Sequence, residues 1–117
     1  MSLDNQKILE ELGKNKDYIV KIPDPITKKI ICFNVTNRKT LVRAVTLFNK
    51  EPVTIDWIRT FKENEIFFDI GANIGQFTIF AGIISDCKIF AFEPESNNFQ
   101  GLNKNIIINN LNHKINA

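Results

Sequence analysis

The sequence predicts an α/β fold with a parallel sheet, and three observations support that prediction. From Ile66 onward, apolar runs suited to strands alternate with longer segments suited to helices. The two runs, IFFDI (66–70) and KIFAF (88–92), are apolar at nearly every position, as in strands buried on both faces of a sheet. A loop with two glycines, GANIG (71–75), follows the first run directly and precedes a helix, as ligand-binding loops do in open α/β sheets.

Composition describes a single folded domain. The chain has 117 residues, of which 44% are hydrophobic and 24% charged, and this excludes disordered and fibrous classes. It contains no run of eighteen apolar residues and no signal-peptide core, so we expect no membrane span and a cytoplasmic location. Cys32 and Cys87 lie far apart and the lone His113 lies in a polar tail, so we expect no metal site and a reducing compartment.

Charge gives little guidance about partners. Residues 1–64 carry twelve Lys and Arg against eight Asp and Glu, whereas residues 65–117 carry three against five. The mildly basic first half favours an anionic substrate, or it is an ordinary solvated surface. The basic residues are not dense enough for nucleic acid, so we expect no nucleic-acid partner.

Residues 1–48 are predicted to form an N-terminal extension with a helix, a β-hairpin and a second helix. Apolar residues recur at helical spacing in its first and last segments, and the two β-prone runs flank the turn residues Pro23, Asp24 and Pro25. In chain order the expected elements are a helix over 4–12, strands over 17–22 and 30–35, and a helix over 40–48.

Residues 49–117 are predicted to form the α/β part. Pro52 interrupts the helical pattern that precedes it, and a short helix follows. In chain order the expected elements are a helix over 54–61, a strand over 66–70, a helix over 75–85, a strand over 88–92 and a helix over 97–110. A third strand should begin within HKINA (113–117), where the sequence stops, so we expect a sheet truncated after the second βα unit.

The glycine loop supplies the candidate site. Gly71 and Gly75 cost stability unless the backbone turns sharply or approaches a ligand there. Unpaired N–H groups at the start of the next helix favour a negative or polar ligand group. Glu93 ends the second strand, and a carboxylate at that place accepts hydrogen bonds from both hydroxyls of a ribose. Together these features indicate a cofactor built on adenosine.

The spacing of the loop favours S-adenosylmethionine over a dinucleotide. The dinucleotide fingerprint is G-x-G-x-x-G, whereas this loop has Asn73 at the second glycine and Gln76 at the third. A compact amino-acid end needs only a short glycine turn and a few polar groups. A nicotinamide-dependent oxidoreductase half-domain is the alternative function, and a non-catalytic remnant that only binds or assembles is another.

The motifs together resemble those of the FkbM-type methyltransferases, a branch of the S-adenosylmethionine-dependent enzymes. The resemblance lies in FFDIGANIGQFTIFAG (67–82) and IFAFEPESNNFQGLNKNIIINNL (89–111), and NKEPVTIDWIRTF (49–61) is similar to the segment before the loop in that family. It implies a Rossmann-like class I methyltransferase fold, here preceded by an N-terminal helix and hairpin, with residues 49–117 as the N-terminal portion of the domain.

The resemblance also implies which residues hold the cofactor. Asp69, Gly71, Asn73 and Gly75 would surround the methionine end of S-adenosylmethionine, and Glu93 would hold the ribose. The implied reaction is methylation of an oxygen, so the expected partner is a small-molecule or glycan acceptor with a sugar or other biosynthetic hydroxyl. Family domains continue through strands that carry the substrate face and any base. No catalytic residue is therefore assigned, and the chain alone is expected to be inactive.

A few further residues and surfaces complete the expectations. Glu51 is either an acid that approaches the site or a surface acid. Thr78 is expected to bond to its own helix backbone, and Cys87 to pack in the core, because no base accompanies it. The N-terminal hairpin and helices are expected to cover part of the second face of the sheet. The rest would form an apolar patch that favours self-association.

Overall fold

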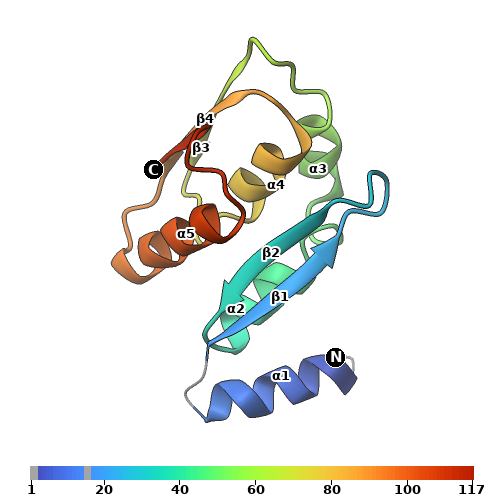
Figure 1. Ribbon diagram of the computed structural model, residues 1–117, viewed down its shortest axis with the longest axis vertical. Helices are drawn as coiled ribbons and strands as arrows, with labels where there is room; N and C mark the ends of the chain where they lie inside the picture. The colour runs from blue at the N-terminus through green and yellow to red at the C-terminus, as the bar shows by residue number, and fades with distance from the viewer. Residues whose placement is uncertain (1–2, 15–16) are drawn as a thin grey trace.

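The computed structural model describes residues 3–14 and 17–117 and contains two small sheets with helices beside them (Figure 1). The elements in chain order are α1 (Leu3–Gly13), β1 (Tyr18–Pro23), β2 (Ile30–Val35), α2 (Arg38–Val45), α3 (Pro52–Ile58), β3 (Ile66–Ile70), α4 (Gln76–Ile84), β4 (Lys88–Phe92), α5 (Ser96–Ile108) and β5 (Ile115–Asn116). This order confirms the α/β class and each helix and strand expected from the sequence, with ends that shift by a few residues.

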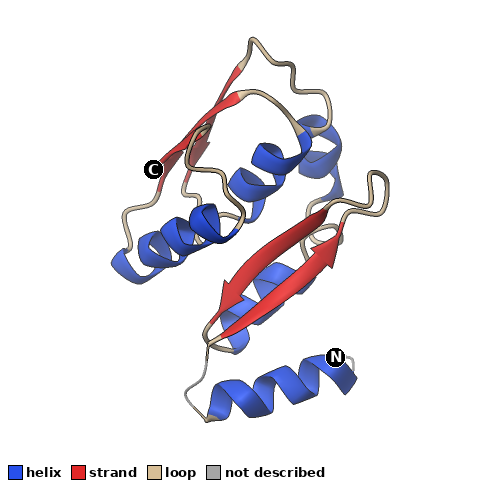
Figure 2. Ribbon diagram, in the orientation of Figure 1, coloured by secondary structure: helices blue, strands red, loops and turns tan. Residues whose placement is uncertain are grey.

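The strands β3, β4 and β5 form a parallel sheet in that spatial order (Figure 2). Ile66 lies opposite Lys88 in the register of β3 and β4, and Ile89 lies opposite Ile115 in that of β4 and β5. The short strand β5 begins where the sequence predicted a third strand. The sheet therefore extends one short strand beyond the second βα unit.

Among the described residues, the helices cover one face of this sheet and leave the other open (Figure 1). Both α4 and α5 lie on the same side of β3 and β4 (Figure 1), as successive right-handed crossovers require. On that side Phe67, Ile89 and Ala91 are buried in the core. Trp57 of α3 packs edge-on against Phe67 with ring centroids 5.7 Å apart, so α3 also belongs to the covered side.

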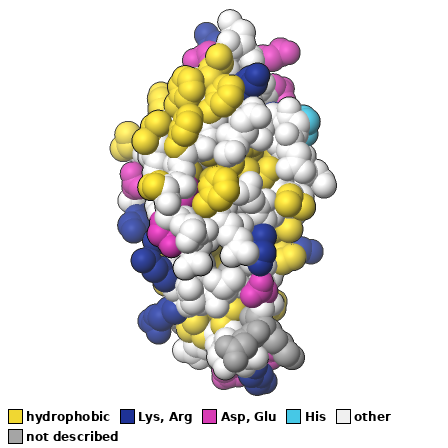
Figure 3. All heavy atoms as spheres, turned by 90° about the vertical axis from the view of Figure 1, so that its left-hand side faces the viewer, with side chains coloured by type: hydrophobic (Ala, Val, Ile, Leu, Met, Phe, Trp, Pro, Cys, Tyr) yellow, Lys and Arg dark blue, Asp and Glu magenta, His cyan; other side chains and the backbone are white. Residues whose placement is uncertain are grey.

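The opposite face of the sheet is apolar and uncovered. Ile66 and Phe68 are each 58% exposed and Ile70 is 76% exposed. Phe68 stacks on Phe90 and Phe92 at centroid distances of 5.5 and 6.3 Å, and hydrophobic side chains gather over this face in Figure 3. The apolar runs suit strands buried on both faces, but one face is exposed in this chain, and the expected apolar patch is confirmed.

The N-terminal hairpin packs on the helices and leaves the second face of the sheet open. β1 and β2 pair antiparallel, and the apolar residues of β2 (Ile31, Phe33 and Val35) are fully buried. β2 contacts α2, α4 and α5, so the helices α4 and α5 lie between the hairpin and the parallel sheet (Figure 1). The expectation that the hairpin shields part of the second face is wrong, because its apolar side is used on these helices.

Asn105 of α5 and Asn109, the C-cap of this helix, bind the free edge of β2. Asn105 accepts a hydrogen bond from the N–H of Asn34 at 2.7 Å and donates to the carbonyl of Ile74 at 2.7 Å. One turn later, Asn109 accepts from the N–H of Cys32 at 2.9 Å and donates to its carbonyl at 2.7 Å. Residues four apart share one face of a helix. The two amides therefore satisfy strand-edge groups that burial would otherwise leave unpaired.

A buried ion pair joins the turn of the hairpin to the end of α3. Asp24 is fully buried, and both guanidinium nitrogens of Arg59 donate to it, Nη1 at 3.1 Å. Thr27 also donates to the Asp24 carboxylate, from its hydroxyl at 2.6 Å and from its N–H at 3.0 Å. The hydrogen bond from Arg59, together with those from Thr27, holds the pKa of Asp24 well below its ordinary value despite burial.

Neither a membrane span nor a metal cluster is found in the part of the chain that the structure describes. None of its helices combines the length and the apolar character that crossing a bilayer requires. No group of three or more His, Cys, Asp or Glu side chains in residues 3–14 and 17–117 is arranged to hold a metal ion.

Charging the uncovered face should reduce self-association. We expect the wild-type chain to be oligomeric or to aggregate, because Phe68, Phe92 and their neighbours form an exposed apolar patch. Replacing both with lysine should shift the chain toward monomer in sedimentation velocity. Val53→Lys is the matched control, because Val53 is 80% exposed on α3, a helix on the covered side of the sheet. A wild-type chain that is already a stable monomer would contradict the prediction.

Candidate functional site

The glycine loop leaves β3 at the carboxyl edge of the sheet and turns sharply into α4. Gly71, Asn73 and Gly75 have left-handed backbones, with φ of 77°, 55° and 93°. Glycine adopts this region without strain, and asparagine tolerates it better than most residues. The N–H groups of Gly71 and Ala72 both donate to the carbonyl of Phe92, at 2.8 and 3.0 Å. The loop is therefore tied to the end of β4.

Glu93 joins the loop to the start of α5. Its Oε1 accepts from the N–H of Asn73 at 3.0 Å, and its Oε2 accepts from the N–H of Glu95 at 3.0 Å. Sequence reasoning placed Glu93 near the loop but did not anticipate this contact. An ionised carboxylate has about four acceptor sites, so each oxygen can still accept a bond from a further donor such as a ribose hydroxyl.

Asp69 lies near the end of β3, and a residue of α4 fixes its carboxylate. Its Oδ2 accepts a hydrogen bond from the hydroxyl of Thr78 at 2.6 Å. Burial raises the pKa of Asp69, the bonds from Thr78 oppose that rise, and the charge of Glu93 adds to it. The expectation that Thr78 bonds to its own helix is wrong. Its fully buried hydroxyl instead orients the carboxylate at the end of the strand.

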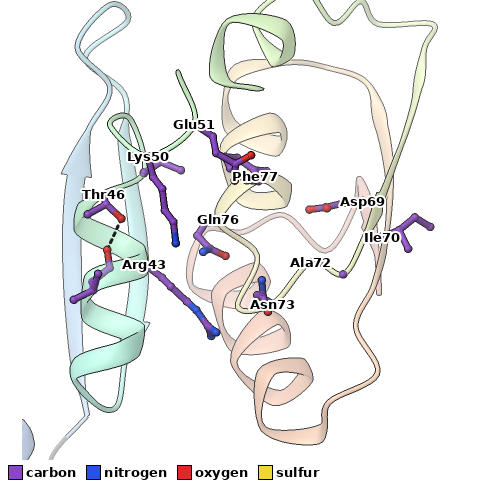
Figure 4. Close-up of a pocket in the computed structure, with 13 residues that line it drawn as sticks. Arg43, Thr46, Lys50, Glu51, Asp69, Ile70, Ala72, Asn73, Gln76 and Phe77 are labelled. Carbon is purple, nitrogen blue, oxygen red and sulfur yellow. Dashed lines mark hydrogen bonds between the residues drawn. The ribbon is translucent and has the colours of Figure 1, made fainter. Parts of the chain in front are cut away.

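A cavity of about 340 Å³ lies between α2 and the loop (Figure 4). Three of the predicted site residues line it, namely Asp69, Gly71 and Asn73. Polar side chains from α2, from the segment after it and from α4 form the rest of the polar lining: Arg43, Thr46, Lys50, Glu51 and Gln76. Of the two interpretations of Glu51, the structure favours the acid near the site. Sequence reasoning missed the cations, because nothing in the pattern of α2 connects it to the loop.

The two glycines differ in what a side chain would meet. A Cβ atom at Gly71 would have nothing within 4 Å, so this glycine leaves open space on the cavity wall. A Cβ atom at Gly75 would lie 2.7 Å from Cδ1 of Leu102 in α5. Gly75 and Glu93 do not line the cavity. Close packing of α4 on α5 accounts for Gly75, and its contact with a cofactor stays a prediction.

Alanine at position 75 should therefore destabilise the fold more than alanine at position 71. Both variants carry the strain of a left-handed backbone, roughly 1–2 kcal/mol. Gly75→Ala adds overpacking against Leu102, which costs roughly a further 1–3 kcal/mol. Urea unfolding followed by circular dichroism should show the lower midpoint for Gly75→Ala. Equal midpoints would refute the packing argument, and in a double-mutant cycle Leu102→Ala should relieve part of the cost.

Comparison with known proteins identifies the fold. No family model matches the chain, and no curated protein matches it significantly. Solved structures with its fold include PH0793, a protein of Pyrococcus horikoshii named as a transferase (TM-score 0.62, 19% identity, 87% of this chain and 36% of that chain). They also include P. horikoshii TYW2 in complex with MeSAdo (TM-score 0.57, 18% identity, 86% of this chain and 35% of that chain).

These neighbours show a methyltransferase-like α/β fold and nothing finer. Their identities of 19% and 18% are too low to carry an activity over to this chain. The chain also spans only about a third of their length, since it covers 36% and 35% of the two solved chains. The predicted α/β class is thus confirmed, together with a fold like that of these neighbours.

Proposed function

We propose that the chain is the N-terminal part of an S-adenosylmethionine-dependent methyltransferase of the FkbM type. The proposed acceptor is a hydroxyl of a sugar or another small biosynthetic molecule. The observation that supports this most is the contact between the two motifs, in which Glu93 accepts the N–H of Asn73 beside the cavity. TYW2, which shares the fold, was solved in complex with MeSAdo, an analogue of S-adenosylmethionine, and this adds support.

The residues around the loop fit such a cofactor. Gly71 leaves space on the cavity wall, and the carboxylate of Glu93 has acceptor sites left for ribose hydroxyls. When bound, S-adenosylmethionine supplies an activated methyl group. The role of this chain would be to hold the ribose through Glu93 and the amino-acid end beside Asp69, which aligns the methyl group for transfer. The surface for the acceptor and any general base would belong to the part of the fold outside the match.

Location and domain organisation form part of the same proposal. Cys32 and Cys87 are both free thiols, which suits the reducing cytoplasm. We propose residues 1–48 as the extension and residues 49–117 as the start of the methyltransferase domain. Contacts of β2 with α4 and α5 dock the extension onto that domain.

Equilibrium dialysis of the 117-residue chain against S-adenosylmethionine and against NAD tests the proposal. We expect binding of S-adenosylmethionine that is displaced by S-adenosylhomocysteine. The expected affinity is low, because adenine would have only one wall of its pocket in this chain. We expect no binding of NAD and no methyl transfer. Binding of NAD alone would favour the oxidoreductase half-domain. Binding of neither at millimolar concentration would favour a non-catalytic remnant.

A further inference from the structure

The wall of the cavity opposite the glycine loop carries two cations. Arg43 extends from α2 and Lys50 from the segment after it, both into the space in front of the loop (Figure 4). Within residues 3–14 and 17–117, neither side chain lies within ion-pair distance of a carboxylate. Arg43 donates one side-chain hydrogen bond, to Asn98 at 3.3 Å. A guanidinium has five donors and an ammonium three, so most of them remain for a ligand.

The same cavity also carries two acids. Asp69 reaches it from the end of β3, and Glu51 reaches it from the start of α3. These carboxylates bond to hydroxyls, Asp69 to Thr78 at 2.6 Å and Glu51 to Thr54 at 3.5 Å, and not to the cations of the facing wall. A small cavity with unpaired charges of both signs is complementary to a zwitterion. An amino acid has that charge pattern, with its carboxylate and its ammonium on one carbon.

We infer that Arg43 and Lys50 bind the carboxylate of the cofactor's amino-acid end, while Asp69 and Glu51 face its ammonium group. This inference rests on the proposed function and deepens it. It makes the N-terminal extension part of the cofactor site, because Arg43 lies within the predicted extension and Lys50 lies just beyond it.

Residues of the site itself hold the Arg43 side chain in position. Asn98 accepts the bond from Arg43 and donates its own amide to Asn73 of the loop at 3.4 Å. α2, the glycine loop and α5 are therefore linked by side chains, and the guanidinium is directed at the loop. Partners of this kind orient a binding group and reduce the freedom that it loses when the ligand arrives.

Three ligands that differ at the amino-acid end show how much each charged group of the cofactor contributes to binding. At the amino-acid end, S-adenosylmethionine has both charges, its decarboxylated form has the ammonium only, and methylthioadenosine has neither. The first two also carry the sulfonium charge. Competition measured by ligand-observed NMR on the 117-residue chain gives their relative affinities. Arg43→Ala should weaken S-adenosylmethionine by roughly 10- to 100-fold, the value of a charge-assisted hydrogen bond. It should not weaken the other two ligands, because neither has a carboxylate, and Arg43→Lys should lose less.

Arg38→Ala is the matched control, because Arg38 is exposed at the start of the same helix and does not line the cavity. It should leave all three affinities unchanged, and circular dichroism should show the same fold for both variants. If Arg43→Ala weakens all three ligands equally, the inference is overturned while the proposed function stands. If the wild-type chain binds none of the three, the proposed function fails and the inference fails with it.

Discussion

Glu93→Ala should weaken the binding of S-adenosylmethionine by roughly 30- to 700-fold, or about 2–4 kcal/mol. The variant would lose charge-assisted hydrogen bonds to two ribose hydroxyls. The structure adds a second cause, because the N–H groups of Asn73 and Glu95 would also lose their acceptor. Competition binding measured by ligand-observed NMR checks the size of the loss.

Controls separate these two causes. An analogue without the ribose hydroxyls should bind the wild type and Glu93→Ala about equally. If the variant still binds that analogue as poorly as it binds the cofactor, Glu93 supports the loop and does not recognise the ribose. Glu93→Gln keeps the shape and one acceptor oxygen, so it should lose less than Glu93→Ala. Glu63→Gln should leave affinity unchanged, because Glu63 is exposed in the turn before β3 and does not line the cavity.

Asp24→Ala should lower the free energy of unfolding by roughly 3–5 kcal/mol, as the loss of one partner of a buried ion pair does. It removes the carboxylate to which the guanidinium of Arg59 is hydrogen-bonded, 5.1 Å from the centre of the Phe80 ring. Urea unfolding measures the loss. The exposed pair of Lys104 and Asp17, 3.4 Å apart, provides the control. Asp17→Ala should change stability by about 1 kcal/mol or less, and equal effects at the two sites would contradict the prediction.

The same ion pair predicts how acid destabilises the chain. The pKa of Asp24 is lowered in the folded state, so its contribution is complete above the ordinary carboxyl pKa of about 4 and declines as the pH falls below it. The wild type should therefore lose more stability than Asp24→Asn when the pH falls from about 5 to about 2. Parallel stability profiles for the two proteins would show that the ion pair is not responsible.

The strands of the sheet were predictable because apolar runs and a glycine loop are local signals. The ends of the helices were less so. Pro52 was predicted to interrupt a helix, but in the structure it is the first residue of α3. Proline is accepted there because the N–H groups of the first helical turn have no partner within the helix. The expectation that the N-terminal hairpin covers part of the second face of the sheet was wrong for another reason. Phe68 and Ile70 show which side chains a strand is suited to bury, but not whether other elements of the chain lie over them.

Some residues of the candidate site could likewise be predicted from the sequence, and others could not. Glu93 and the glycine loop follow neighbouring parallel strands, so their proximity was predictable from the order of the elements. Arg43 and Lys50 reach the cavity only through tertiary packing, which leaves no pattern in the sequence. Asn105 and Asn109 did leave a signal, because a pair of amides four residues apart interrupts the apolar face of α5.

The bonds from these two asparagines to β2 can form only after the ribosome has synthesised α5. The residues that they join are 71 and 77 positions apart in the chain. At a synthesis rate of roughly 5–20 residues per second, the hairpin waits roughly 4–15 s before α5 has been made. During that interval the backbone groups of Cys32 and Asn34 form an open strand edge. Residues 30–35 of the newborn chain can thus pair with another nascent chain during that interval, and this exposure ends when α5 docks.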